Sequence, residues 1–133
     1  MASGALLPKA LWQFGRMIPC VQPGTNALLY NNYGCWCGLG GGAEPVDDVD
    51  MCCKLHDKCY HDKASRLAPG CTAIADLPYL LVYDYTCHNR QATCSASNTR
   101  WQAAVCECDR VAAHCFARTK YNPENKNLDQ SVH

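Results

Sequence analysis

The stretch that decides the fold is Cys52-Cys53-Lys54-Leu55-His56-Asp57-Lys58-Cys59. Its cysteines and histidine recur at steps of three and four residues, which places most of them on one broad face of an α-helix. Pro45 and the acidic residues that follow it are typical of a helix start, because carboxylates favour the positive end of the helix dipole. We therefore predict a long helix over residues 45–66, with His56 facing inward among disulfides.

Cysteine is unusually frequent in this chain, at 12 of 133 residues. Disulfides persist in oxidising compartments, and an even cysteine count in a short chain is typical of a secreted, extracellular protein. A chain of this length usually makes one domain. The formal net charge is zero, which argues against a module that attracts nucleic acid or another polyanion. No apolar run approaches the roughly 18 to 20 residues that span a bilayer.

The flanking segments predict a mainly α, disulfide-rich fold. Apolar residues at helical spacing indicate a short N-terminal helix over residues 11–18, which Pro19 should stop. The glycine-rich residues 34–42 predict a loop with unusual backbone angles. Residues 81–86 and 91–94 predict a small β-hairpin with its turn at His88 and Asn89. Residues 99–119 predict a second long helix, antiparallel to the first, and the polar tail after Tyr121 should be mobile.

The two long helices also carry the candidate chemistry. Helices tied by disulfides can hold an imidazole and a carboxylate in register, as general-base catalysis requires, and His56 and Asp109 are the candidate pair. Asp57 offers a hard oxygen ligand beside a loop whose carbonyls could turn towards one cation, which suits calcium. Zinc is disfavoured, because the chain has no C-x-x-C pair and its cysteines serve better as disulfides. A purely structural scaffold, with His56 in the core and Asp57 solvated, remains open.

Three motifs, found in order, resemble the secreted phospholipase A2 family over residues 10–129. They are Tyr33-Gly34-Cys35-Trp36-Cys37-Gly38-Leu39-Gly40-Gly41, which resembles the calcium loop, the Cys52-to-Cys59 stretch quoted above, which resembles the active-site histidine motif, and Cys106-Glu107-Cys108-Asp109, which resembles the aspartate motif. The beginning Ala10-Leu11-Trp12-Gln13-Phe14 and the ending Tyr121-Asn122-Pro123 resemble the pancreatic-type, group I-like branch in particular.

The resemblance implies interfacial, calcium-dependent hydrolysis of the sn-2 ester of glycerophospholipids, which releases a fatty acid and a lysophospholipid. His56 would activate a water that attacks the ester carbonyl, and Asp109 would orient the imidazole, with no acyl-enzyme. Tyr60 and Tyr83 match the family's tyrosines that hydrogen-bond the aspartate, although core packing alone would also explain them. A binding protein that has lost catalysis is the alternative class, and the joint retention of His56, Asp57 and Asp109 argues against it.

The resemblance also implies a calcium site. Its ligands would be the carbonyl oxygens of Trp36, Gly38 and Gly40 and the carboxylate of Asp57. The Gly38 amide would in addition donate a hydrogen bond to the oxyanion.

Phospholipid aggregates and membrane surfaces are the implied partners. Residues 1–9 resemble an activation peptide that a trypsin-like protease would remove after Lys9, and a cloning remnant or unprocessed leader is the alternative. Residues 10–133 would then form a single phospholipase A2 domain. The residues that match the family's interfacial surface are Trp12, Leu28, Leu29, Leu39 and Tyr79.

Ten of the cysteines match the family's disulfide pattern. Cys35 lacks its usual partner because the tail after Asp129 has no cysteine, and Cys71 lacks its partner because Trp101 stands at the matching position. These two cysteines could be free thiols, link two chains or pair with each other. The implied pairs are Cys20–Cys87, Cys37–Cys53, Cys52–Cys115, Cys59–Cys108 and Cys94–Cys106.

Overall fold

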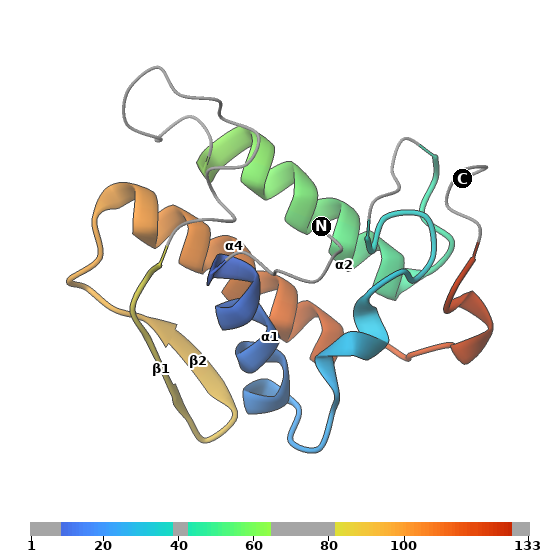
Figure 1. The fold of residues 1–133 in the computed structure, drawn as a ribbon, viewed down its shortest axis with the longest axis horizontal. Coiled ribbons are helices and arrows are strands. Elements are labelled where there is room, and N and C mark those ends of the chain that lie inside the picture. Colours follow the sequence, from blue (N-terminus) through green and yellow to red (C-terminus); the bar gives the residue numbers. More distant parts are fainter. Residues whose placement is uncertain (1–8, 39–42, 65–81, 129–133) are drawn as a thin grey trace.

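Two antiparallel helices, α2 (Asp48–Cys59) and α4 (Arg100–Ala117), form the frame of the structure (Figure 1). The computed structural model describes residues 9–38, 43–64 and 82–128. Helix α1 (Lys9–Val21) packs against α4, and the hairpin of β1 (Tyr85–His88) and β2 (Gln91–Cys94) lies beside α1. The mainly α, disulfide-rich fold is confirmed. No described helix combines the length and apolar character of a membrane span.

Helix α2 begins three residues later than predicted. Asp47 has extended backbone angles, and its side chain accepts a hydrogen bond from the Asp50 amide (2.8 Å), so it caps the helix. Beyond Cys59 the chain continues in a short π-helical segment, η2 (Tyr60–Ala64). The end predicted at residue 66 lies outside the described residues.

Helix α4 agrees closely with its prediction. Thr99 and Gln102 form a reciprocal capping box at its start, in which each side chain bonds the other residue's amide. The helix therefore begins where the sequence indicates, and it places the buried Asp109 on the side that faces α2.

The prediction that Pro19 stops the first helix is wrong, because α1 continues through it to Val21. A proline removes its own amide donor and crowds the carbonyl four residues earlier, but here it lies in the last turn of the helix, with few helical bonds beyond it to disturb. The Gln22 amide bonds the Ile18 carbonyl (2.9 Å) around it. The disulfide from Cys20 to Cys87 also ties this last turn to the hairpin.

The hairpin turn lies one residue later than predicted. His88 pairs with Gln91 in the last step of the antiparallel ladder, so Asn89 and Arg90 form the two-residue turn. Both have positive φ, at 52° and 62°, as a hairpin turn that follows the strand twist requires. The predicted strand character before Tyr85 is absent from residues 82–84.

The tail was predicted to be mobile, but residues 122–128 pack against the glycine-rich loop. Gly34 donates its amide to the Asn125 carbonyl (2.8 Å), and Asn127 donates to the Asn32 carbonyl (2.7 Å). Tyr33 pairs with Lys126 in an isolated β-bridge. These contacts depend on backbone groups far apart in sequence, so polar composition did not reveal them. Residues 1–8, which hold most of the predicted leader, and the last five residues lie outside the described part.

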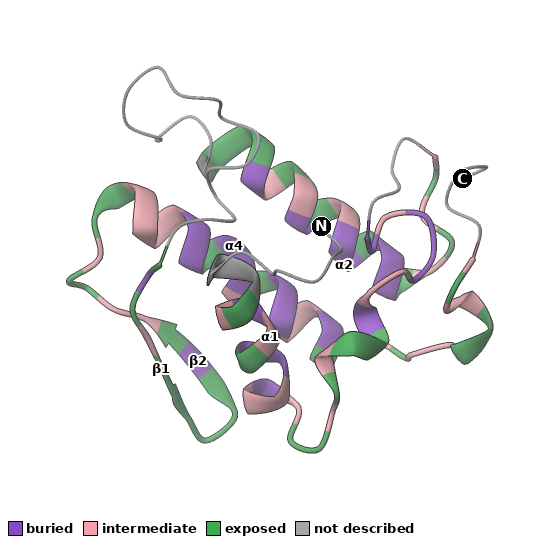
Figure 2. Cartoon of the chain, in the orientation of Figure 1, coloured by how far each residue is buried: buried purple, intermediate pink, exposed green. Residues whose placement is uncertain are grey.

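All five implied disulfides are present. They cross-link a core in which buried residues line the facing sides of α1, α2 and α4 (Figure 2). Cys35 is fully buried and is the free cysteine of the described residues, and Cys71 lies outside them. Burial raises the pKa of the Cys35 thiol, and the Asp50 charge raises it further. Because the thiolate is the reactive form, this thiol should be inert in the folded protein.

We predict that Cys35 escapes alkylation in the native protein and reacts only after unfolding. The test exposes native and denatured protein, without reductant, to a thiol alkylator and maps modified peptides by mass spectrometry. Native modification of Cys35, or its recovery in a cross-linked peptide, would contradict the prediction.

Candidate active site

The centre of the site is a buried contact between the two long helices. His56 Nε2 lies 2.7 Å from Asp109 Oδ1, and the two residues are 3% and 0% exposed. Disulfides bracket this contact: Cys59 and Cys108 lie three residues after His56 and directly before Asp109, and Cys52 and Cys115 lie four residues before His56 and six after Asp109. With Asp109 as the acceptor, Nε2 carries the proton and the Nδ1 lone pair is left to accept another.

Two tyrosines complete the hydrogen bonds of the Asp109 carboxylate. Tyr60 donates its hydroxyl to Oδ1 at 2.5 Å, and Tyr83 donates to Oδ2 at 2.6 Å. Burial raises the pKa of Tyr83, and the Asp109 charge adds to that rise, so the phenol keeps its proton and stays a donor. Both tyrosines therefore lie where the sequence prediction needed them. A buried carboxylate with three donors is held firmly in position.

The imidazole ring is also held by aromatic packing that the sequence prediction missed. The Phe14 ring of α1 stacks on the His56 ring, with centroids 4.5 Å apart and 16° between the planes. Tyr60 packs against the His56 ring at a centroid distance of 4.4 Å. Phe14 belonged to the apolar stripe of the first predicted helix, but no local signal indicates which ring it meets.

The glycine-rich loop is fastened to α2 beside the dyad. The disulfide Cys37–Cys53 joins the loop to a residue that lies one helical turn before Asp57, on the same side of α2. Trp36 and Gly38 flank Cys37, and Gly38 has a φ of 130°, which favours glycine. The loop part of the predicted cation site thus lies against α2. Gly40 and Leu39 lie outside the described residues.

The donor chemistry beside this loop fits a hard cation. Burial raises the pKa of the Asp57 carboxyl, and the Asp50 charge contributes to the rise. A bound cation would favour the ionised form of such a carboxylate. Within residues 9–38, 43–64 and 82–128, no three His, Cys, Asp or Glu side chains gather as metal ligands. The predicted ligands among the described residues, the Asp57 carboxylate and the carbonyls of Trp36 and Gly38, are all oxygens, the kind of ligand that calcium prefers.

Asp50 is a second residue that the sequence prediction missed, and it accepts hydrogen bonds from the backbone of the glycine-rich loop. Asp50 is fully buried in the first turn of α2, and its carboxylate accepts backbone hydrogen bonds from Cys35, Trp36 and Val46. In the sequence it is one of the acidic residues after Pro45 that predict a helix start. Nothing local distinguishes a carboxylate that turns inward from one that faces solvent.

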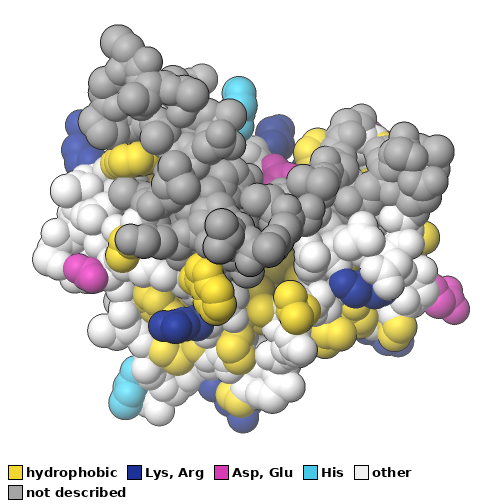
Figure 3. Space-filling model, in the orientation of Figure 1, with side chains coloured by type: hydrophobic (Ala, Val, Ile, Leu, Met, Phe, Trp, Pro, Cys, Tyr) yellow, Lys and Arg dark blue, Asp and Glu magenta, His cyan; other side chains and the backbone are white. Residues whose placement is uncertain are grey.

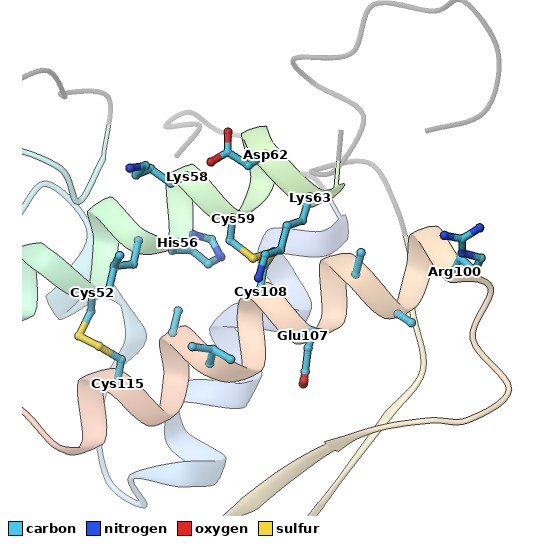
Figure 4. A pocket seen from close by; sticks show the side chains of 15 residues that line it. Cys52, His56, Lys58, Cys59, Asp62, Lys63, Arg100, Glu107, Cys108 and Cys115 are labelled. Carbon is cyan, nitrogen blue, oxygen red and sulfur yellow. A yellow bond between two sulfur atoms is a disulfide. The ribbon is translucent and has the colours of Figure 1, made fainter. Parts of the chain in front are cut away.

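A groove of about 680 Å³ lies between α2 and α4 (Figure 4). Leu55 and Val111 are among its apolar lining, and Lys58, Lys63 and Glu107 are among the charged side chains that also line it. Of the dyad only His56 contributes to the lining; Asp109 does not. The groove therefore adjoins the dyad without containing it.

Three of the predicted interfacial residues are described, and all are exposed. Trp12 is 55% exposed, Leu28 63% and Leu29 41%. Hydrophobic side chains gather on the face that α1 presents (Figure 3). Tyr79, like Leu39, lies outside the described part of the chain.

Comparison with known proteins agrees with this geometry. Residues 11–126 match the family model for phospholipase A2. Relatives named phospholipase A2 are 51% identical in sheep over 122 residues (91% of this chain, 98% of the relative) and 50% identical in cattle over 123 residues (92% and 83%). A rabbit relative of that name is 45% identical over 130 residues (97% and 89%). The chain therefore belongs to the secreted phospholipase A2 family and is an enzyme that hydrolyses phospholipids.

Proposed function

We propose that this enzyme is a calcium-dependent, interfacial phospholipase in which His56 is the general base and Asp109 its positioning partner. The observation that carries the proposal is the 2.7 Å contact between His56 Nε2 and Asp109 Oδ1 inside a disulfide-bracketed helix pair. Asp57 follows His56 directly in the chain, so the base and the proposed cation ligand come from the same turn of α2.

The proton transfer follows from the hydrogen bonds. Asp109 accepts from Nε2 and so fixes the tautomer that leaves Nδ1 as the base. Nδ1 would take a proton from a water as that water attacks the sn-2 ester carbonyl, and the carboxylate would stabilise the imidazolium that forms. Tyr60 and Tyr83 hold the carboxylate, while stacking on Phe14 holds the ring plane. No acyl-enzyme is needed.

The cation site would complete the chemistry. The carbonyls of Trp36, Gly38 and Gly40 and the Asp57 carboxylate would hold calcium, which when bound supplies positive charge for the substrate phosphate and the ester carbonyl. The Gly38 amide would donate to the oxygen on which negative charge develops.

Substrate reaches this site from a lipid aggregate, so the enzyme must first adsorb. We assign adsorption to the exposed apolar residues Trp12, Leu28 and Leu29, because tryptophan favours the headgroup zone of a membrane. Leu39 and Tyr79 would extend the same surface. Secretion fits the five disulfides, which persist outside the cytosol.

Replacing the base should abolish turnover while leaving the fold intact. We expect His56→Gln to lower fatty-acid release from phospholipid vesicles by about 100-fold or more, the usual contribution of a general base. Calcium binding should persist, because the proposed ligands are unchanged. His61→Gln is the matched control, since the His61 side chain is 87% exposed. Release by His56→Gln at the parent rate would refute the assigned base.

Removing the ligand carboxylate should remove the cation. We expect Asp57→Asn to lose measurable calcium binding in a calorimetric titration, and Asp57→Lys to lose both binding and activity, because each removes the negative charge of the site. A chelator should abolish fatty-acid release by the parent chain.

Asp62→Asn, at an exposed position on the following turn, controls for the loss of one acidic residue and should bind calcium like the parent. Calcium affinity in Asp57→Asn equal to that of the parent would exclude Asp57 as a ligand.

Adsorption should depend on the apolar surface more than on charge. We expect Leu28→Ala to weaken binding to zwitterionic phosphatidylcholine vesicles, whereas Leu55→Ala should not, because Leu55 has similar exposure (52%) but lines the groove between α2 and α4. With zero formal net charge, parent binding should change little with ionic strength. A steep loss of vesicle binding with added salt would argue for electrostatic adsorption instead.

A further inference from the structure

We propose that Asp50 is a positioning residue for the cation site, because its carboxylate fixes the half of the loop that carries the Trp36 carbonyl. This inference rests on the proposed calcium-dependent function. It assigns to Asp50 no contact with substrate or cation.

Both carboxylate oxygens of Asp50 accept hydrogen bonds from backbone amides. Oδ1 accepts the Trp36 amide at 2.7 Å, and Oδ2 accepts the amides of Cys35 at 2.8 Å and Val46 at 3.0 Å. The residue is 0% exposed. Among the described residues, no basic side chain forms an ion pair with it. A carboxylate buried in this way is stabilised by its amide donors, so it and the loop hold each other in place.

The backbone of Gly34 is shaped to this carboxylate. A Cβ atom added to Gly34 would lie 2.5 to 2.7 Å from Asp50 Cγ, Oδ1 and Oδ2, closer than real contacts allow. Gly34 also has a φ of +58°, in the left-handed region. Both observations require glycine here, and together they show that the carboxylate packs directly on the loop backbone.

The direction of the Trp36 carbonyl follows from peptide planarity. The Trp36 amide points to Asp50, which orients the peptide before this residue. The Cys37 amide donates to the Tyr33 carbonyl at 3.1 Å. In a planar trans peptide the N–H and C=O point in opposite directions, so the Trp36 carbonyl, which shares a peptide with the Cys37 amide, points away from Tyr33. The Cys37 amide bond therefore sets the direction of this proposed cation ligand, and the Asp50 bond to the Trp36 amide fixes the peptide immediately before it.

A role in starting the helix does not explain Asp50. Asp47 already caps α2, and Asp48 lies exposed in the same first turn, where it can interact with the helix dipole. Asp50 instead faces inward, and its oxygens are occupied by loop amides. This difference between neighbouring acidic residues supplies a matched control.

The test compares Asp50→Asn with Asp48→Asn. Each variant loses one negative charge from the first turn of α2, but only Asp50→Asn places an amide group against backbone amide donors. We expect Asp50→Asn to bind calcium about tenfold or more weakly by calorimetric titration, the order of effect of leaving a buried donor unsatisfied. Asp48→Asn should bind like the parent.

Hydrogen exchange supplies a readout that does not use calcium. In the calcium-free parent, the amides of Cys35 and Trp36 should exchange slowly, and in Asp50→Asn they should exchange faster while amides in the middle of α4 stay protected. Parent-like affinity in Asp50→Asn, or unchanged protection of both loop amides, would overturn the inference.

A second variant and the parent chain itself separate failure of this inference from failure of the proposed function. If Asp50→Asn does not fold, Gly34→Ala tests the same contact, because its Cβ would displace the Asp50 carboxylate; parent-like calcium affinity in Gly34→Ala would overturn the inference. A parent chain that binds no calcium would overturn the proposed function itself. If the parent chain binds calcium and Asp50→Asn binds it with equal affinity, only the role of Asp50 is overturned.

Discussion

The structure depends on a pair of disulfides that lock two antiparallel helices around one buried hydrogen bond. Cys52–Cys115 and Cys59–Cys108 set the separation and the register of α2 and α4. An imidazole and a carboxylate can then meet in the interior at 2.7 Å, although they lie 53 residues apart. In a chain of this size the core alone gives modest stability, so covalent cross-links provide the rigidity that holds this pair in register.

Few polar side chains are buried in the described part of this molecule, and those few lie in the helix pair and against the glycine-rich loop. Among the described residues the buried polar or charged side chains are Asp50, His56 and Asp109. Asp109 accepts three hydrogen bonds, from the His56 imidazole and from the hydroxyls of Tyr60 and Tyr83. Asp50 accepts three from backbone amides. Asp109 therefore holds the His56 imidazole, and Asp50 holds the loop backbone. Both roles exploit the high cost of leaving a buried donor or acceptor unpaired.

The C-terminal segment fastens the glycine-rich loop through hydrogen bonds near the free, buried Cys35. Tyr33 donates its hydroxyl to Asp47, which also accepts from the Asn125 side chain (2.9 Å). The Gly34 amide bonds the Asn125 carbonyl. A network of neutral and charge-assisted hydrogen bonds thus fastens the segment to the loop, while Cys35 stays a buried thiol.

The sequence by itself determined the two long helices, their inward faces and the pairing of His56 with Asp109, because helical periodicity and caps are local properties and the motifs resemble a known family. It also placed Tyr60 and Tyr83 correctly through that resemblance. Only the tertiary structure decided that α1 continues through Pro19, that the tail packs on the loop, that Phe14 stacks on His56 and that Asp50 bonds the loop amides. Each of these depends on a partner distant in sequence or on the direction of a side chain, and neither leaves a periodic signal in the chain.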